Sequence, residues 1–161
     1  MTEEDVPQVT ELVNEYLGKR KVHIMLDEMT VAHYFIPREG VVQTYVFAKD
    51  GKKISDLFSF YIKRLCIRPE SGYKHEYITQ AYSFYNISTS GRLSDGMSDM
   101  LHRAKQAGCD SYSCLDTMEE NYTNIFDRLK LYCGNRYGLR FYLFNWHMPR
   151  IHPCHIGMAL I

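Results

Sequence analysis

The 161-residue sequence lacks long apolar runs, an excess of charge of either sign, and paired cysteine motifs. No stretch approaches the roughly 20 apolar residues that a helix needs to cross a bilayer, and the acidic start Met1–Asp5 is unlike a signal peptide. We therefore expect a cytoplasmic protein that is not transmembrane. The 19 basic and 19 acidic residues balance without a basic cluster, so no nucleic-acid partner is expected.

Cysteine and histidine do not form a recognisable metal site. The 5 cysteines are odd in number and contain no C-x-x-C pair, which fits neither a disulfide framework nor a zinc ribbon. We expect free, buried thiols. His147, His152, Cys154 and His155 crowd the C-terminal segment, but their spacing matches no common zinc pattern and two prolines keep the segment extended. No metal is therefore expected.

Several catalytic motifs are also missing. No Gly-rich phosphate loop and no G-x-S-x-G elbow occurs, which disfavours nucleotide hydrolysis and serine esterase chemistry. Asp116, Glu119 and Glu120 form an acidic cluster that is compatible with paired-carboxylate catalysis, but attraction of acidic side chains to a helix N-terminus explains it more simply.

The chain is rich in tyrosine, with 13 residues, and aromatic side chains make up 14% of it. Such a composition suits twisted sheets, and also grooves that hold an extended ligand through phenol hydroxyls. A β-rich core explains it equally well. With 45% hydrophobic residues the chain is long enough for one buried core, and we expect a single domain.

Apolar periodicity, caps and turns predict alternating helices and strands. Asp5 and Pro7 suit a helix start, Pro37 ends a helix, and Asp50-Gly51 suits a hairpin turn. The order resembles an α/β fold of the acyl-CoA N-acyltransferase (GNAT) kind, with a mixed, mostly antiparallel sheet flanked by helices. Helices are predicted at 5–17, 27–35, about 88–107 and 124–132, and strands at 41–47, 54–61, 77–87, 111–115 and 139–146.

The most specific signal is a series of short strings in a fixed order. They are Asp5–Val9, His33–Glu39, Ser59–Tyr61, Ala81–Asn86, Asp95–Asp99, Leu115–Glu119, Phe141–Trp146 and Ile156–Ile161. The Tyr-Ser-Phe-Tyr-Asn string and the Asn-Trp followed by a tail ending Gly-x-x-Leu-x are the most distinctive. Together the strings resemble the second half of the glycylpeptide N-tetradecanoyltransferases (N-myristoyltransferases), over nearly the whole chain.

The resemblance implies that residues 1–161 are the C-terminal, peptide-binding domain of such an enzyme, and that the N-terminal acyl-CoA domain is absent. The implied reaction transfers myristate from myristoyl-CoA to the N-terminal glycine of proteins. Myristoyl-CoA is then a co-substrate held mainly by the missing N-terminal half, and no cofactor is bound tightly. The expected partners are Gly-starting peptides of protein substrates and a separate or upstream N-terminal half.

In this family the C-terminal carboxylate is the general base, and here it belongs to Ile161. An α-ammonium has a pKa near 8 and an α-carboxyl a pKa of roughly 3.5, a gap of about 4 units or roughly 6 kcal/mol. Burial of the apolar tail narrows that gap, because it raises the pKa of the carboxyl and lowers that of the amine. The resemblance places Tyr61, Tyr82, Leu139 and Leu160 on the peptide groove, although each suits a core equally well.

Two departures from the family bear on the substrate. The family usually continues Ser-Phe-Tyr with Leu-Pro-Ser-Thr, where this chain has Lys63–Cys66, so Leu65 replaces a hydroxyl. In the loop Cys133–Gly138, Asn135 or Arg136 replaces the family's acid. Loss of the acid weakens attraction for basic peptide side chains.

The isolated chain is predicted to lack useful transferase activity. The oxyanion donors, typically worth about 2.7–4 kcal/mol, are expected in the other half. The main alternative is a degenerate, non-catalytic binding module or gene fragment of the same fold. A complete, unrelated acetyl-CoA acyltransferase is a weaker alternative, because Ser88–Arg92 is only a faint candidate for a pyrophosphate-binding turn.

Overall fold

A four-stranded mixed sheet forms the centre of the protein. The computed structural model describes residues 1–49, 51, 53–72, 74–119, 122–132 and 141–159. The strands β2 (Val42–Lys49), β3 (Lys53–Cys66), β4 (Tyr77–Ser88) and β5 (Ser111–Ser113) lie in the order β2-β3-β4-β5. The first three are antiparallel, whereas β5 runs parallel to β4. The predicted mostly antiparallel α/β sheet is therefore confirmed.

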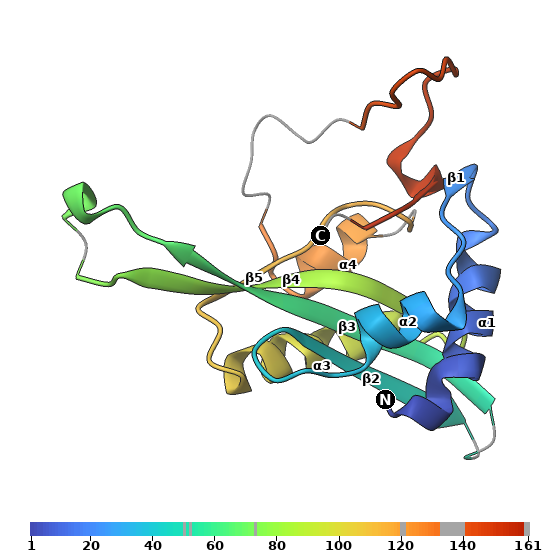
Figure 1. The fold of residues 1–161 in the computed structure, drawn as a ribbon, viewed down its shortest axis with the longest axis horizontal. Coiled ribbons are helices and arrows are strands. Elements are labelled where there is room, and N and C mark those ends of the chain that lie inside the picture. Colours follow the sequence, from blue (N-terminus) through green and yellow to red (C-terminus); the bar gives the residue numbers. More distant parts are fainter. Residues whose placement is uncertain (50, 52, 73, 120–121, 133–140, 160–161) are drawn as a thin grey trace.

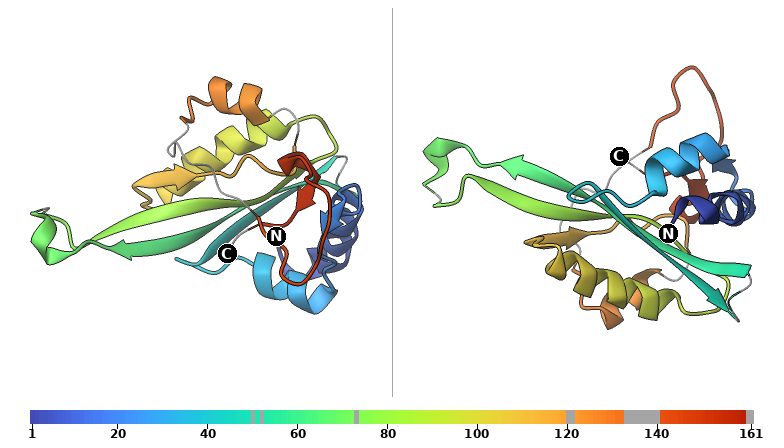
Figure 2. Two further views of the ribbon diagram at one scale, coloured as in Figure 1. Left: turned by 90° about the horizontal axis from the view of Figure 1, so that it is seen from above. Right: turned by 60° about the horizontal axis from the view of Figure 1, so that its bottom comes forward.

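Helices cover both faces of this sheet (Figure 1). On one face lie α1 (Val6–Leu17), preceded by the short 3-10 helix η1 (Glu3–Asp5), and α2 (Glu28–Phe35). On the other lie α3 (Leu93–Gln106) and α4 (Tyr122–Arg128), as Figure 2 shows. The two helical layers bury separate apolar clusters, one against each face of the sheet.

Local signals set the first two helices. In α1 the apolar residues at helical spacing, among them Val9, Val13 and Leu17, are fully buried against the sheet. Asp27 caps α2, because its carboxylate accepts a hydrogen bond from the Thr30 N–H at 2.7 Å. Both predicted helices are confirmed.

The start of α3 differs from the prediction, which began that helix near Ser88. Ser88 ends β4, and the turn after it is tied to the sheet instead. The Asp56 carboxylate, which is fully buried, accepts hydrogen bonds from the Ser90 N–H at 3.1 Å and the Ser90 hydroxyl at 2.6 Å. Gly91 turns the chain with φ 80°, and the helix begins at Leu93.

A bulge in β4 changes which side chains share a face. Phe60 pairs with Ser83 and Phe58 pairs with Asn86, so Ser59 alone lies opposite both Phe84 and Tyr85. The buried Ser59 hydroxyl donates to the Tyr85 carbonyl at 3.0 Å and accepts from the Tyr85 N–H at 3.1 Å. As a result, Phe84 and Tyr85 both point to the α1/α2 face.

A second, two-stranded sheet joins the chain's first and last described parts. β1 (Val22–His23) pairs in parallel with β6 (Ile156–Gly157), and the 3-10 helix η3 (Pro153–His155) leads into β6. This pairing lays the segment after Cys154 beside α1, and carries its last described residues toward β4.

β3 and β4 also extend beyond the body of the protein as a two-stranded arm (Figure 1). Residues Lys63–Cys66 pair with Tyr77–Gln80, and the short 3-10 helix η2 (Pro69–Ser71) lies near the tip. The predicted strand at 54–61 is therefore too short. No helix in the described part of the chain is both long and apolar enough to cross a membrane.

The predicted aromatic strand 139–146 is wrong over its described residues, 141–146. That segment has no strand partner and turns at Asn145, which has φ 58°. Tyr142, Phe144 and Trp146 are 83%, 99% and 72% exposed. Strand propensity reflects packing against neighbouring strands, which these side chains do not find among the described residues.

Candidate functional site

The candidate site lies where two parallel strands separate. β5 pairs with β4 only from Gln80 to Tyr82, and beyond this point the strands diverge. The last described residue, Ala159, lies at the opening. The small pocket there is lined by Ser83, Phe84, Cys114, Leu115, Thr117, Met118, Tyr122 and Ala159.

The C-terminal tail is held at this opening by backbone contacts. A Cβ added to Gly157 would lie 3.0 Å from His23 Cβ and 3.1 Å from Leu17 Cδ2, so a larger residue would require these side chains to shift, and β6 packs closely on α1 and β1. Two residues later, the Ala159 N–H donates a hydrogen bond to the Tyr85 hydroxyl at 3.3 Å. Burial raises the pKa of Tyr85, so the hydroxyl stays protonated at neutral pH.

An aromatic row extends from the tail along β3 and β4; it comprises Tyr61, Tyr82, Phe84 and Tyr85, together with Tyr34 of α2, whose ring meets Phe84 edge-on at 6.2 Å. The Phe84 and Tyr85 ring centroids are 4.6 Å apart, and Phe84 meets Tyr61 edge-on at 5.9 Å. Tyr61 and Tyr82 stack at 5.2 Å with an interplanar angle of 8°. Because both are only partly buried, the row presents aromatic surface along the strands.

Polar groups cap the outer end of the aromatic row. The Lys63 ammonium lies 5.2 Å from the Tyr61 ring centroid and 5.7 Å from that of Tyr82. The Tyr82 hydroxyl donates to Gln80 Oε1 at 2.6 Å, and Gln80 Nε2 donates to Ser113 Oγ at 2.6 Å. These hydrogen bonds fix the Tyr82 ring between β4 and β5.

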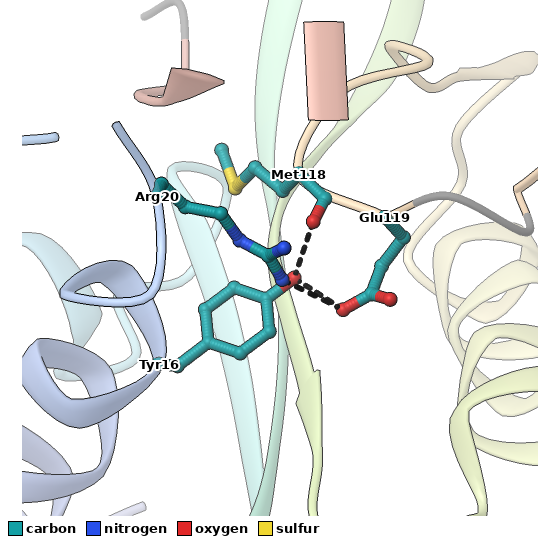
Figure 3. A network of polar contacts seen from close by, with 4 residues as sticks. All are labelled: Tyr16, Arg20, Met118 and Glu119. Carbon is teal, nitrogen blue, oxygen red and sulfur yellow. Dashed lines mark hydrogen bonds and ion pairs between the residues drawn. The ribbon is translucent and has the colours of Figure 1, made fainter. Parts of the chain in front are cut away.

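A polar network ties α1 to the segment that follows β5 (Figure 3). The Tyr16 hydroxyl donates to Glu119 Oε1 at 2.6 Å, and Arg20 Nη2 lies 3.3 Å from the same oxygen. Burial, and then Glu119, raise the pKa of the Tyr16 phenol. The Glu119 carboxylate is therefore committed to structural contacts, which argues against the catalytic interpretation of the acidic cluster around it.

The same arginine also supports the tail. Arg20 Cγ lies 3.2 Å from the position of a Cβ on Gly157, and its guanidinium lies 4.8 Å from the Tyr16 ring centroid. Arg20 thus packs between the network and β6, so the position of the tail depends on the contact of α1 with Glu119.

The structure brings together two of the residues that the sequence placed on the groove, Tyr61 and Tyr82. The other two groove residues, Leu139 and Leu160, and the predicted general base, Ile161, lie outside the described residues, so their roles stay predictions. Sequence reasoning missed Tyr34, Phe84, Tyr85 and Ala159. The signal was present, since they lie in the strings His33–Glu39, Ala81–Asn86 and Ile156–Ile161.

Thiols and histidines form no cation site in the described ranges, where no three His, Cys, Asp or Glu side chains lie close enough to hold a metal ion. His152 Nδ1 lies 3.1 Å from Cys154 Sγ. The described cysteines are free. Cys154 is buried as expected, but Cys66 is exposed on the arm, which corrects the expectation that all thiols are buried.

Comparison with known families decides the relationship. A sequence profile described as "Myristoyl-CoA:protein N-myristoyltransferase, C-terminal domain" matches residues 1–157. The chain belongs to this family. The predicted resemblance to N-myristoyltransferases is therefore confirmed, and the chain corresponds to the C-terminal part.

Curated N-myristoyltransferases match along the whole chain. Glycylpeptide N-tetradecanoyltransferase 2 of Bos taurus is 36% identical over 160 residues, which are 99% of this chain and 31% of that protein. The glycylpeptide N-tetradecanoyltransferase of Plasmodium falciparum is 34% identical over 161 residues, 100% of this chain and 38% of that protein. The chain thus spans about a third of the length of these relatives.

Solved structures confirm the GNAT-like fold. The Saccharomyces cerevisiae N-myristoyltransferase with bound myristoyl-CoA superimposes with a TM-score of 0.66 at 23% identity, covering 84% of this chain and 36% of that one. An acetyltransferase from Trypanosoma brucei gives 0.65 at 15% identity, covering 89% of this chain and 96% of that one. At these identities the likeness concerns the fold alone.

The Cys114 thiol beside the tail is expected to react slowly. Burial raises its pKa to about 11. At pH 8 about one such thiol in a thousand is a thiolate, against about a quarter of thiols with an ordinary pKa of about 8.5. Iodoacetamide should therefore label Cys114 roughly 250-fold more slowly than an ordinary thiol at pH 8, and the rate should rise about tenfold per pH unit up to about pH 11.

Peptide mass spectrometry after timed labelling measures this rate, with the exposed Cys66 as the internal reference. The raised pKa of Cys114 also determines how its contribution to stability depends on pH. Folding holds the Cys114 proton more tightly, so its contribution to stability is present below the unfolded pKa of about 8.5 and is lost as pH rises through about 11. Equal labelling of both cysteines at pH 8 would contradict the burial of Cys114.

Proposed function

We propose that residues 1–161 act as the C-terminal, peptide-binding domain of an enzyme that transfers myristate from myristoyl-CoA to the N-terminal glycine of proteins. The observation that supports this most is the hydrogen bond from the Ala159 N–H to the Tyr85 hydroxyl. It holds the tail two residues before its end, beside an aromatic row able to line an extended peptide.

In this proposal the terminal carboxylate of Ile161 accepts a proton from the incoming glycine ammonium. The free amine then attacks the thioester carbonyl, the amide forms, and CoA leaves as the thiol. An apolar setting raises the pKa of a carboxyl and lowers that of an ammonium, which eases the transfer. Met118 and Tyr85, both buried, line the approach of the tail and supply such a setting.

The peptide would lie along the aromatic row, with Tyr61 and Tyr82 in contact with it and Leu139 and Leu160 nearer the reacting amine. Stacked tyrosines offer flat apolar area to an extended peptide at low conformational cost. Myristoyl-CoA would be held mainly by a separate or upstream N-terminal domain. The proposed place of this reaction is the cytoplasm.

The test is acyl transfer from myristoyl-CoA to a Gly-starting peptide, with and without a separately supplied N-terminal domain of a relative. We expect transfer only with that domain, because the oxyanion donors, worth about 2.7–4 kcal/mol, would come from it. Mass spectrometry of the peptide detects the added acyl group. Absence of acyl transfer in both conditions would contradict the transferase proposal and favour a binding module of the same fold.

A further inference from the structure

We infer that Lys63 gives the aromatic row a preference for peptides carrying an acidic side chain a few residues after the N-terminal glycine. The inference rests on the proposed function and specifies the substrate class of the same site. It starts from a charge that the row carries at its outer end.

Lys63 lies on the same face of the sheet as the aromatic row. Tyr61 precedes it by two positions on β3, so the two side chains point to one side, and Tyr82 lies opposite Tyr61. The Lys63 ammonium rests over both rings, at 5.2 and 5.7 Å from their centroids. A peptide extended along the row would therefore pass this ammonium.

The charge is available to a ligand. Lys63 is exposed, and none of the carboxylates in the described ranges lies within 4.0 Å of its ammonium. Its strand partner is the neutral Gln80. The two tyrosine rings restrict the position of the ammonium without neutralising it, so an acidic side chain of a bound peptide would meet a localised positive charge.

The strand spacing sets the position of the preferred acid. Tyr85, which anchors the tail, and Gln80, which pairs with Lys63, are five positions apart on β4 (85 − 80 = 5). Because the bulge places Phe84 and Tyr85 together opposite Ser59, four positions before Lys63, the separation at about 3.3 Å per residue is roughly 13–16 Å, or about four to five residues of an extended peptide. We therefore expect the preference near the fifth to seventh residue of the substrate, to within a position or so.

Peptides of one Gly-starting sequence, with a single Asp, Ala or Lys moved along roughly the third to eighth positions, test the inference. Fluorescence anisotropy measures their binding to the 161-residue chain. At the best position we expect the Asp peptide to bind about fivefold more tightly than the Lys peptide, the upper end of the range for an exposed charge pair. The difference should shrink in 1 M salt.

The variants separate a local effect from net charge. Lys63→Gln should abolish the preference, and Lys63→Glu should reverse it. Arg64→Glu is the matched control: it makes the same charge change one residue along β3, on the opposite face, where Arg64 lies 5.1 Å from the Tyr77 ring centroid. Arg64→Glu should keep the preference for Asp.

Equal effects of Lys63→Glu and Arg64→Glu, the same affinity for Asp and Lys peptides, or no binding of any peptide would each overturn the inference. The transfer assay separates it from the proposed function. A charge preference without acyl transfer in the presence of an N-terminal domain supports the role of Lys63 and contradicts the proposed transferase function. Acyl transfer without a preference for acidic peptides contradicts only the role of Lys63.

Discussion

Adding one glycine after Ile161 is expected to slow acyl transfer about a thousandfold, within the range of about 10²–10⁴ that a general base contributes. The extra residue moves the terminal carboxylate by up to about 3.8 Å. A general base has to lie within roughly 2.6–3.2 Å of the atom that loses the proton. The single-turnover rate, measured with a supplied N-terminal domain, checks this.

The control for the extension is Ile161→Leu, which keeps the carboxylate in place and nearly conserves side-chain volume. Its rate should stay within a few-fold of the unmodified chain. The dissociation constant of a Gly-starting peptide should change little in either variant, since the carboxylate acts on the proton and not on the aromatic row. An extended chain that transfers myristate at the original rate would exclude Ile161 as the base.

Replacing Gly96 by alanine is expected to destabilise the fold by about 3 kcal/mol, at the upper end of the cost of overpacking a core. Gly96 faces β3 from α3, and a Cβ at this position would lie 2.0 Å from Phe58 Cζ and 2.3 Å from Phe58 Cε2. The Phe58 ring is 6% exposed and packs among Met97 and Met100, so it has to shift toward the cavity that it lines together with Gly96 and lose part of these contacts. Urea denaturation followed by circular dichroism measures the loss.

Two further variants locate this effect. Lys105→Ala, at an exposed position of the same helix, should change stability by less than about 0.5 kcal/mol. Phe58→Leu in the Gly96→Ala background should recover part of the loss, because a shorter side chain relieves the contact and the two positions are coupled. If Gly96→Ala is as stable as the unmodified chain, α3 does not pack on β3 as closely as described.

Sequence patterns anticipated those elements whose cause is local. The cap at Asp27, the buried stripe of α1 and the long strands β2 and β3 depend on residues close together in the chain. The family strings likewise located Tyr61 and Tyr82, which the structure stacks together. For these, the order of residues was sufficient.

The sequence-based predictions failed where contacts between distant segments determine the structure. Residues 141–146 have high strand propensity, yet no strand pairs with them in the described part of the chain. The sequence favoured attraction to a helix N-terminus as the explanation for Glu119, whereas its carboxylate contacts Tyr16 and Arg20, about a hundred positions earlier. Neither outcome is encoded within a short window of sequence.

By itself the sequence determined the family, the helical and strand segments with local signals, and the identity of the tail that carries the proposed base. Only the tertiary structure decided that a bulge in β4, opposite Ser59, turns both Phe84 and Tyr85 to one face. It also decided that β6 pairs with β1, so that Ala159 reaches Tyr85. The physical reason is that strand register and tail docking depend on hydrogen bonds and packing between distant segments, which local propensity does not specify.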